Sequence, residues 1–574
     1  MGDRMKTIPF ASLLDRVVNE YERERSIYGI RETDFFRDST GKLIDYNGEC
    51  MSNLIGPAAG PHTQMAQNLA AAYLSGGRFF ELKTVQVLDS LSFPKPCIYA
   101  EDECYNTEWS TELSIEDACS EYVKGWFLLF FLAGEIFGLN VQDYIFNMSV
   151  GYDLDGIKSS KVDRFIDNLK DASGTDVFQE CRTVLFKKAP HFRKFDPGCL
   201  ENLSPHICSS IALSTMHGCP PEEIESICEH LLGEKELHTY IKLNPTLLGY
   251  KFVRQTLDQM GYGYIRLSEE SFDKDLNFDQ ACSLITKINK LAAEKGRKVG
   301  IKLSNTLPVK ITSGELPGNE MYLSGRPLYP LTINLAYSLA AAFKGEICIS
   351  YCGGADHKNA AQIVESGIYP VTVATTLLKP GGYNRLKKLS EAVAPVQRKA
   401  LQGIRLDQLK KLAERSINET VYRKMKQRIL RKPAQPLPVF DCRESCRMCT
   451  DVCPNRANHL VTVSGDGFKF SRQVLHLDHI CNECGNCSVF CPEKGEPYRD
   501  KFTYFQSEND FYDSSNNGFL GNRNGQLDTF LIRVNGKVLQ VGSDAINKSG
   551  VSESDCASYQ FIREIIANYS YLLL

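Results

Sequence analysis

Eight of the 21 cysteines in this 574-residue chain fall into two short groups with similar spacing. The groups read Cys442-x3-Cys446-x2-Cys449-x3-Cys453-Pro454 and Cys481-x2-Cys484-x2-Cys487-x3-Cys491-Pro492. The N-terminal residues lack a signal-peptide core, so we expect the thiols to be reduced. Clustered cysteines in a reducing compartment more often bind metal than form disulfides. The spacing therefore predicts a metal centre.

Zinc and iron-sulfur clusters are the two candidates for this centre. Pairs of cysteines at x2 spacing can hold zinc, but a closed zinc site has no need of a further cysteine followed by proline. In bacterial two-cluster ferredoxins that Cys-Pro cysteine binds the other cluster. The first spacing departs from this pattern, with x3 where x2 is usual. We predict two [4Fe-4S] clusters, one held by Cys442, Cys446, Cys449 and Cys491 and the other by Cys481, Cys484, Cys487 and Cys453.

Clusters transfer single electrons and make no bonds, so the rest of the chain must supply a reaction centre or a scaffold. Up to about residue 395, short apolar segments alternate with helical ones, which favours parallel βαβ units. Nine segments are candidate strands, where a closed barrel needs eight; the sequence does not say which one lies outside. They are Asn53–Ala58, Phe79–Thr84, Tyr144–Val150, Ser210–Ser214, Tyr240–Leu243, Tyr264–Leu267, Val299–Leu303, Ile347–Ser350 and Val371–Ala374.

The overall charge and hydropathy exclude several classes of partner. The chain has 66 Lys+Arg against 70 Asp+Glu, a net charge of -4, which argues against nucleic acid or an anionic membrane as the main partner. No apolar run approaches the ~18 residues that a bilayer span needs. We therefore expect a soluble, cytoplasmic protein.

Changes in composition divide the chain into four parts. We predict a barrel over residues 1–395, a basic helical linker over 396–438, a two-cluster ferredoxin domain over 439–505 and a C-terminal extension of unknown role over 506–574. From Arg385 to Lys432 there are 15 Lys or Arg against four Asp or Glu, in an amphipathic pattern. This segment is either a solvated linker or a docking surface for an acidic partner.

Polar and glycine-containing motifs lie at or after the ends of the expected strands. They are Asn53-Leu-Ile-Gly-Pro-Ala-Ala-Gly60, Phe80-Glu-Leu-Lys-Thr84, Leu213-Ser-Thr-Met-His-Gly-Cys-Pro-Pro221, Tyr240-Ile-Lys-Leu-Asn-Pro245, Ser304-Asn-Thr306, Leu323-Ser-Gly-Arg-Pro-Leu-Tyr-Pro330, Cys352-Gly-Gly-Ala355 and Ala374-Thr-Thr376. In type and order they resemble the dihydroorotate dehydrogenase and dihydropyrimidine dehydrogenase families. The whole chain resembles the selenate reductase subunit family of anaerobic purine-degradation gene clusters, which joins such a barrel to a ferredoxin domain.

The resemblance implies an α/β fold: a (β/α)8 TIM barrel that binds FMN, followed by a two-cluster ferredoxin-like domain and a small C-terminal extension. A barrel places cofactor sites at the carboxyl ends of its strands, where glycines admit a phosphate and lysines can face a reduced flavin. Lys242 and Lys302 stand in similar motifs, and we favour Lys242. The predicted cofactor-binding residues are Ala58, Ala59, Gly60, Lys83, Thr84, Asn147, Lys242, Asn305, Thr306, Gly325, Gly353, Gly354, Thr375 and Thr376.

Reduction of a double bond by a flavin also needs a proton donor on the opposite face of the substrate. Cys219 stands where the dihydropyrimidine dehydrogenases carry their catalytic cysteine, although the loop here is several residues shorter. Ser214 and His217 are the alternative donors, and a structural role for Cys219 stays open. Asn244, Thr246 and Glu108 are the predicted substrate contacts.

No GxGxxG follows a strand, so a Rossmann site for NAD(P)H or FAD is not expected in this sequence. We predict that a separate flavoprotein, resembling the small subunit of glutamate synthase and binding FAD and NAD(P)H, feeds the clusters in a hetero-oligomer. The first hypothesis is an enzyme acting on CH-CH or CH-NH bonds, in which FMN reduces a C=C or C=N bond of a small purine-like or pyrimidine-like heterocycle, with urate as one candidate. The alternative is a non-catalytic electron-transfer or scaffold subunit. Selenate reduction is not favoured, since nothing resembles a molybdenum-cofactor site.

Overall fold

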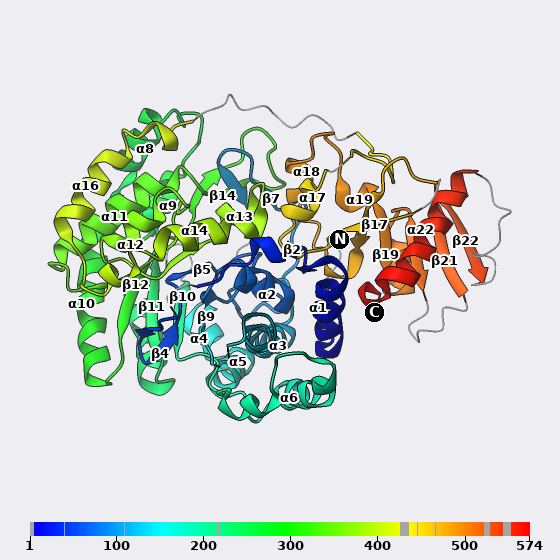
Figure 1. Ribbon diagram of the computed structural model, residues 1–574. Helices are drawn as coiled ribbons and strands as arrows, with labels where there is room; N and C mark the ends of the chain where they lie inside the picture. Colours follow the sequence, from blue (N-terminus) through cyan, green and yellow to red (C-terminus); the bar gives the residue numbers. More distant parts are fainter. Residues whose placement is uncertain are drawn as a thin grey trace.

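The computed structural model describes residues 5–38, 41–107, 110–139, 141–214, 219–424, 435–444, 446–464, 467–521, 529–542 and 553–573. Figure 1 shows a barrel surrounded by helices on one side and a second, smaller sheet on the other. Helix α1 (Phe10–Glu24) lies between them and contacts the last described turn, η10 (Ser570–Leu572).

The barrel is one sheet of eight parallel strands in the order β5-β16-β15-β12-β11-β10-β9-β6. The strands are β5 (Ile55–Pro57), β6 (Phe79–Glu81), β9 (Ile145–Val150), β10 (Ser210–Ser214), β11 (His238–Leu243), β12 (Val299–Leu303), β15 (Cys348–Tyr351) and β16 (Val371–Val373). The first and last strands of this order meet, since Arg78 N donates to Ile55 O at 2.8 Å. The predicted TIM barrel is confirmed.

Eight of the nine candidate strands form the barrel, and Tyr264–Leu267 is the one outside it. Leu267 makes only an isolated antiparallel bridge to Val309. This segment follows helix α8 (Tyr250–Gln259) at the carboxyl end of the barrel. A short apolar run cannot by itself be assigned to a sheet, because strands and buried loops look alike over four residues.

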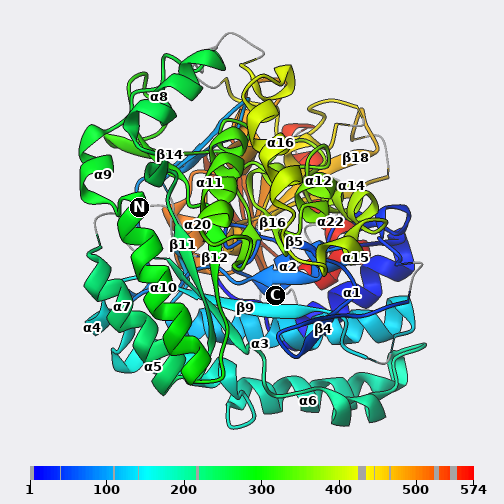
Figure 2. The same ribbon diagram turned by 90° about the vertical axis from the view of Figure 1, so that its left-hand side faces the viewer.

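The helices form an outer layer around the strands (Figure 2). They include α2 (Ala66–Leu74), α3 (Ile115–Leu132), α5 (Ser160–Lys170), α6 (Asp176–Lys188), α7 (Pro221–Glu229), α10 (Phe278–Glu294), α11 (Leu328–Ala342), α12 (Ala360–Glu365) and α14 (Arg385–Val393). Helix α3 is apolar on nearly every face because α2, α5 and α6 all pack on it. Its first turn is capped by the Ser114 side chain, which accepts from Asp117 N at 3.0 Å.

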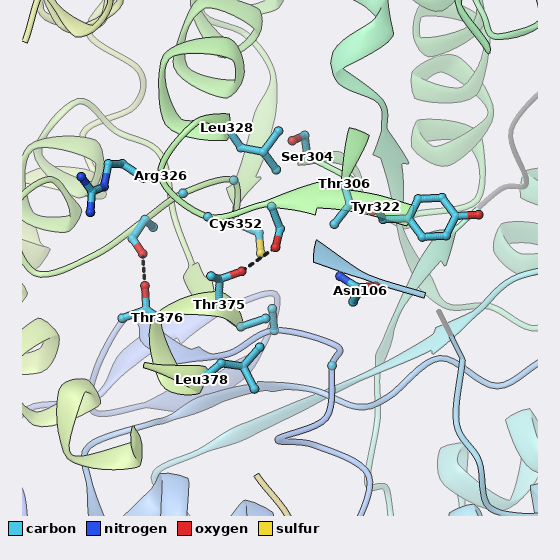
Figure 3. A pocket seen from close by; sticks show the side chains of 18 of the residues that line it. Asn106, Ser304, Thr306, Tyr322, Arg326, Leu328, Cys352, Thr375, Thr376 and Leu378 are labelled. Carbon is cyan, nitrogen blue, oxygen red and sulfur yellow. Dashed lines mark hydrogen bonds between the residues drawn. The ribbon is translucent and has the colours of Figure 1, made fainter. Parts of the chain in front are cut away.

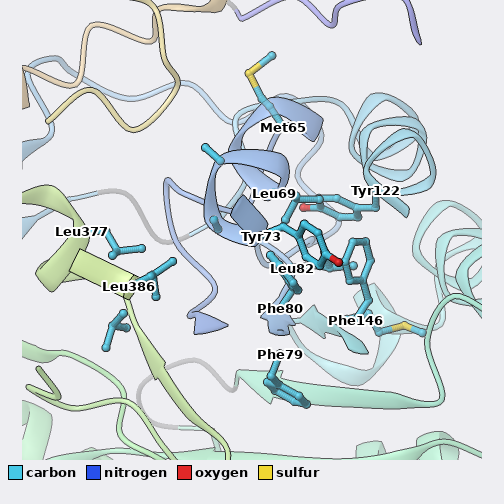
Figure 4. Packing of buried hydrophobic residues seen from close by; sticks show 14 of the residues in the cluster. Met65, Leu69, Tyr73, Phe79, Phe80, Leu82, Tyr122, Phe146, Leu377 and Leu386 are labelled. Atoms are coloured by element: carbon cyan, nitrogen blue, oxygen red, sulfur yellow. The ribbon is translucent and has the colours of Figure 1, made fainter. Parts of the chain in front are cut away.

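Aromatic side chains fill the space between α2, α3 and the barrel wall. Figure 4 shows Tyr73 and Tyr122 facing Phe80 and Phe146 there. The rings of Phe80 and Phe146 lie 5.4 Å apart between centroids, and all four side chains are buried. Rings of this size bury much apolar area, so this cluster fixes the helix layer against the strands that begin the barrel.

A separate four-stranded antiparallel sheet lies over the carboxyl end of the barrel, and we call it the roof sheet. Its order is β13-β14-β8-β7, with strands β13 (Leu307–Lys310), β14 (Glu320–Ser324), β8 (Cys104–Asn106) and β7 (Ile98–Tyr99). Because β13 begins four residues after β12 ends, the roof sheet must stand at the strand ends where the predicted site residues gather.

The segment predicted as a basic linker contains α15 (Gln397–Ala400) and α16 (Leu406–Ser416). Helix α16 packs on α11 of the barrel and buries Leu409, Leu412 and Ala413. Residues 425–434 lie outside the described part. The amphipathic pattern therefore reflects packing onto the barrel as far as Tyr422, which is also buried.

The C-terminal part is built on one sheet of six strands in sequence order. The strands are β17 (Asn458–Thr462), β18 (Arg472–Leu477), β19 (Phe502–Phe505), β20 (Gly518–Gly521), β21 (Thr529–Val534) and β22 (Lys537–Gly542), and helix α22 (Glu553–Tyr569) follows. The sheet runs from the cysteine region into the predicted extension. None of the described helices has the length and apolar character needed to cross a bilayer.

Candidate functional site

A cavity of about 840 Å³ opens at the carboxyl ends of the barrel strands, beneath the roof sheet, and we call it the large cavity. Thirteen of the fourteen predicted cofactor residues line it: Ala58, Ala59, Gly60, Lys83, Thr84, Lys242, Asn305, Thr306, Gly325, Gly353, Gly354, Thr375 and Thr376. The exception is Asn147, which is buried in β9 and accepts a hydrogen bond from Ser210 Oγ at 2.7 Å.

The turn after β15 admits only glycine at two positions. A Cβ atom on Gly353 would lie 2.0 Å from Thr332 Oγ1, and one on Gly354, where φ is +71°, would lie 2.6 Å from Tyr329 N. Bare backbone at such a point lets a bound group approach closely. The two glycines therefore leave bare backbone at this point of the cavity wall.

Hydroxyl groups continue the wall beyond β16. Thr375 Oγ1 and Ser324 Oγ share a hydrogen bond of 2.7 Å, and Thr376 Oγ1 donates to Ala355 O at 2.7 Å, as Figure 3 shows. Both threonines begin the short helix α13 (Thr375–Leu378). With the glycines, these groups form a polar end of the large cavity that fits an anionic phosphate.

Three lysines, Lys83, Lys242 and Lys302, lie at or just after the ends of the early and middle barrel strands, and two of them line the large cavity. Lys83 and Lys242 do so, whereas Lys302 forms a buried ion pair with Glu81 and donates to Thr372 Oγ1 at 2.6 Å. Burial lowers the pKa of Lys242, while Cys352 and Glu81 oppose that effect. The structure thus separates two lysines that stand in similar sequence motifs.

Several lining residues were not predicted. Asn106 and Tyr322 come from the roof sheet, and Arg326 ion-pairs with Asp102 at 2.8 Å. Lys379 donates to Glu101 O at 3.0 Å. Arg326 belongs to the sequence motif 323–330, which offers a local signal, but the roof sheet joins segments more than 200 residues apart and has none.

The candidate proton donors lie in different surroundings. Ser214 ends β10 and lines the large cavity. Cys219 lines a smaller cavity with Lys242, Asn244 and Thr246, and its Sγ lies 3.8 Å from Glu223 Oε2. Burial and the neighbouring Glu223 raise the pKa of Cys219 to about 12. His217 and Glu108 lie outside the described residues.

The predicted substrate contacts Asn244 and Thr246 both bind one carboxylate rather than lining the large cavity. Asn244 Nδ2 donates to Asp275 Oδ2 at 3.0 Å, and Thr246 Oγ1 donates to the same oxygen at 2.7 Å. Asn305, which lines the large cavity, donates through Nδ2 to Asn244 Oδ1 at 2.8 Å. A chain of hydrogen bonds therefore links Asp275 to the large cavity.

The cysteines of the two sequence groups surround two further cavities in the partition that their spacing predicts. Cys442, Cys446, Cys449 and Cys491, the outer group, line one cavity. Cys453, Cys481, Cys484 and Cys487, the inner group, line the other. In each cavity, the fourth cysteine is the one before proline in the other sequence motif: Cys491 in the outer group and Cys453 in the inner group. Within the described residues, no three His, Cys, Asp or Glu side chains come together as the ligands of a single metal ion.

The inner group lies against the wall of the large cavity. Ile98 and Leu378 line that cavity, Ile98 N donates to Cys484 O at 2.9 Å, and Asn486 Nδ2 donates to Leu378 O at 2.9 Å. One layer of residues therefore separates the inner group from the large cavity. The outer group is more exposed and lies beside the exposed side chains of Arg443 and Arg472.

Comparison with known proteins gives one family and a set of distant structures. The family model described as "Oxidoreductase YgfK, N-terminal TIM-barrel domain" matches residues 28–424. The YgfK proteins of Escherichia coli strains K12 and O157:H7 are each 46% identical over 455 residues, covering 77% of this chain and 44% of their own length. This chain therefore spans less than half the length of those relatives.

Two solved structures of DHODH from Eimeria tenella are also similar. The ligand-free structure has 14% sequence identity and a TM-score of 0.41, covering 69% of this chain and 98% of that chain. The complex with ferulenol has 13% identity and a TM-score of 0.43, covering 70% and 97%.

Proposed function

Because this chain belongs to the family of the N-terminal TIM-barrel domain of oxidoreductase YgfK, we propose that it is an iron-sulfur flavoprotein oxidoreductase subunit. In this proposal the large cavity binds FMN and the two cysteine groups hold [4Fe-4S] clusters. Electrons come from a separate flavoprotein that oxidises NAD(P)H. The substrate is a small purine-like or pyrimidine-like heterocycle, with urate as the first candidate, whose C=C or C=N bond is reduced.

The main support for the proposal is the position of the inner cysteine group against the wall of the large cavity. Cys484 O accepts from Ile98 N at 2.9 Å, and Ile98 itself lines the cavity. Electron transfer between cofactors needs them close together, and a separation of one residue layer meets that need. A cavity elsewhere on the barrel would leave the clusters without a role in its chemistry.

The residues that line the large cavity fit both the phosphate and the ring of FMN. Gly353 and Gly354 admit the phosphate to bare backbone, and Thr375 offers a hydroxyl beside it. Lys83 and Lys242 also line the cavity, and their positive charge would stabilise a negatively charged reduced ring. When bound there, FMN would supply hydride transfer to the substrate.

The proton for the reduced bond comes from this chain's own side chains. Cys219 keeps its proton at neutral pH, because burial and Glu223 raise its pKa to about 12. The thiol is therefore in the protonated form that a general acid requires, but a pKa this far above neutral makes it a weaker acid than a group that titrates near the operating pH. Ser214 at the end of β10 is the alternative donor, since its side chain lines the large cavity.

The second candidate function is an electron-transfer subunit without a substrate. It would need no polar groups beyond those that hold the cofactor. The large cavity, however, also presents Asn106, Tyr322 and Ser271, which come from the roof sheet and from α9 (Glu269–Lys274). These groups offer hydrogen bonds to a small polar ligand, and they favour the enzyme.

The cofactor content of the anaerobically purified chain tests the proposal. We expect about one FMN and about eight irons per chain, since two cubane clusters hold four irons each. Addition of NADH or NADPH alone should leave the flavin absorbance unchanged, and dithionite should bleach it. Eight irons without flavin would contradict the flavoenzyme and favour the electron-transfer subunit. Bleaching by NADH or NADPH alone would contradict the need for a partner.

A further inference from the structure

Asp275 lies just after α9 and receives two hydrogen bonds on one carboxylate oxygen. The donors are Asn244 Nδ2 at 3.0 Å and Thr246 Oγ1 at 2.7 Å, and both act on Oδ2. The backbone N–H of Asp275 donates to Ser271 O at 3.3 Å, which fixes the residue at the end of the helix. Asp275 does not line the large cavity, so any influence on a ligand there must pass through another side chain.

The carboxylate decides which way the Asn244 amide faces. An ionised carboxylate only accepts hydrogen bonds, whereas an amide has one donating and one accepting end. Asn244 must therefore turn its NH2 group toward Asp275, which leaves Oδ1 on the opposite side. Asn305 Nδ2 donates to that oxygen at 2.8 Å.

The orientation of Asn244 in turn decides the orientation of Asn305. Because the NH2 group of Asn305 is turned toward Asn244, its Oδ1 atom is left as the end that can face a ligand. No hydrogen bond within the described part of the chain engages this oxygen, and Asn305 lines the large cavity. The charge of Asp275 is linked to Asn305 through two successive hydrogen bonds. It therefore determines which end of the Asn305 amide faces the large cavity.

We propose that Asp275 is a positioning residue that holds Asn305 with its carbonyl oxygen toward the large cavity, so that the site selects heterocycles with a ring N–H. The inference rests on the proposed function, because it names a feature of the same substrate. The ligand class is the cyclic amide or cyclic urea, whose ring N–H donates to Asn305 Oδ1. A ring nitrogen that carries a methyl group, or that only accepts, would leave the oxygen unpaired.

The test compares ring N–H and ring N-methyl probes on the flavin-loaded chain. The probes are uracil, 1-methyluracil, 3-methyluracil, urate and the four monomethyl urates, and binding is followed by the change in flavin absorbance. For the wild type, we expect methylation at one ring nitrogen to weaken binding by about tenfold or more, the effect of one lost hydrogen bond. In Asp275→Ala this preference should shrink to about twofold, because Asn244 then loses the carboxylate that orients its NH2 group toward Asp275 and its Oδ1 toward Asn305.

Two further variants separate this role from a structural one. Asp275→Asn keeps the shape and one accepting oxygen, so it should retain part of the preference. Asp273→Asn removes a charge from the exposed face of α9 and should leave the preference unchanged. Flavin content should match the wild type in all variants. An undiminished preference in both Asp275 variants would overturn the inference while leaving the proposed function intact. Failure of every probe to bind the flavin-loaded wild type would overturn the proposed substrate class, and the inference with it.

Discussion

Lys242 and Lys302 are partners in register on adjacent strands, yet they have different surroundings. Lys302 is enclosed by Glu81, Ser350 and Thr372, which satisfy its ammonium group inside the barrel. Lys242 lines the large cavity instead. Lys302, in the motif KLSNT, is therefore part of the packed barrel interior. Lys242, in the similar motif KLNPT, is part of the candidate site.

Substitution of each lysine by methionine should separate these two roles. Lys302→Met leaves Glu81 buried without its partner and should lower the free energy of unfolding by about 3–5 kcal/mol. Lys242→Met should leave the urea midpoint close to that of the wild type but make the flavin harder to reduce, because a positive charge beside the reduced ring is lost. Urea denaturation and a potentiometric flavin titration measure the two effects. Equal loss of stability in both variants would contradict this division.

Cys219 and Ser214 differ in how each could serve as the proton donor. The raised pKa of Cys219 keeps the thiol protonated from acidic pH up to about 12, so its ionisation should not limit the rate between pH 6 and 10. We expect Cys219→Ala to reduce urate turnover more than 100-fold, within the typical range for loss of a general acid, and to retain flavin. Ser214→Ala is the control. Full activity in Cys219→Ala together with inactivity in Ser214→Ala would assign the proton to the serine.

Among the secondary-structure elements, the barrel strands could be predicted from local sequence patterns. The roof sheet could not, because its strands come from distant parts of the chain. The barrel strands are apolar segments between helices, so all eight could be found from the sequence. In the roof sheet, β8 pairs with β14 across more than 200 residues and β7 has only two residues. Asp275 was missed for a related reason, since its partners Asn244 and Thr246 lie 31 and 29 residues earlier.

The helix α18 (Asn486–Val489) joins the inner cysteine group to the barrel through one side chain. Asn486 Nδ2 donates to Leu378 O at 2.9 Å and to Val452 O at 2.8 Å, and the side chain is buried. Asn486→Ala leaves two buried carbonyl groups without this donor, so we expect a loss of about 2–4 kcal/mol in unfolding free energy. Thermal and urea denaturation measure this loss of unfolding free energy.

The exposed Asn568 provides the matched control for this change. Its Nδ2 donates to Glu564 Oε2 at 2.9 Å on the surface of α22. Asn568→Ala should alter the unfolding free energy by less than about 0.5 kcal/mol. A similar small effect in Asn486→Ala would show that α18 does not fasten the cysteine region to the barrel.

Across the whole molecule, the large cavity and the two cysteine-lined cavities stand in an order that suits the proposed electron path. The large cavity is enclosed by the barrel end and the roof sheet, the inner cysteine group lies against its wall, and the outer group lies beside exposed arginines. In the proposed function, electrons from a protein donor reach the outer group first, because it is the more exposed of the two. The exposed side chain of Arg472 would favour an acidic docking surface on that donor, whereas Arg443 is already ion-paired with Glu493 at 3.6 Å.

Substitution of one cysteine of the outer group tests the proposed electron path. Cys449 is the most buried member of the outer group, and Cys449→Ala should lose about four irons while keeping the flavin and the inner cluster. Dithionite is small and can reach the flavin or the inner cluster, so it should still bleach the flavin of this variant. Reduction by a protein donor such as a reduced ferredoxin should slow by at least about tenfold, because the entry point is gone. Unchanged reduction by the protein donor would place the entry at the inner group or at the flavin itself, and would reverse the direction of transfer inferred from the exposure of the two groups.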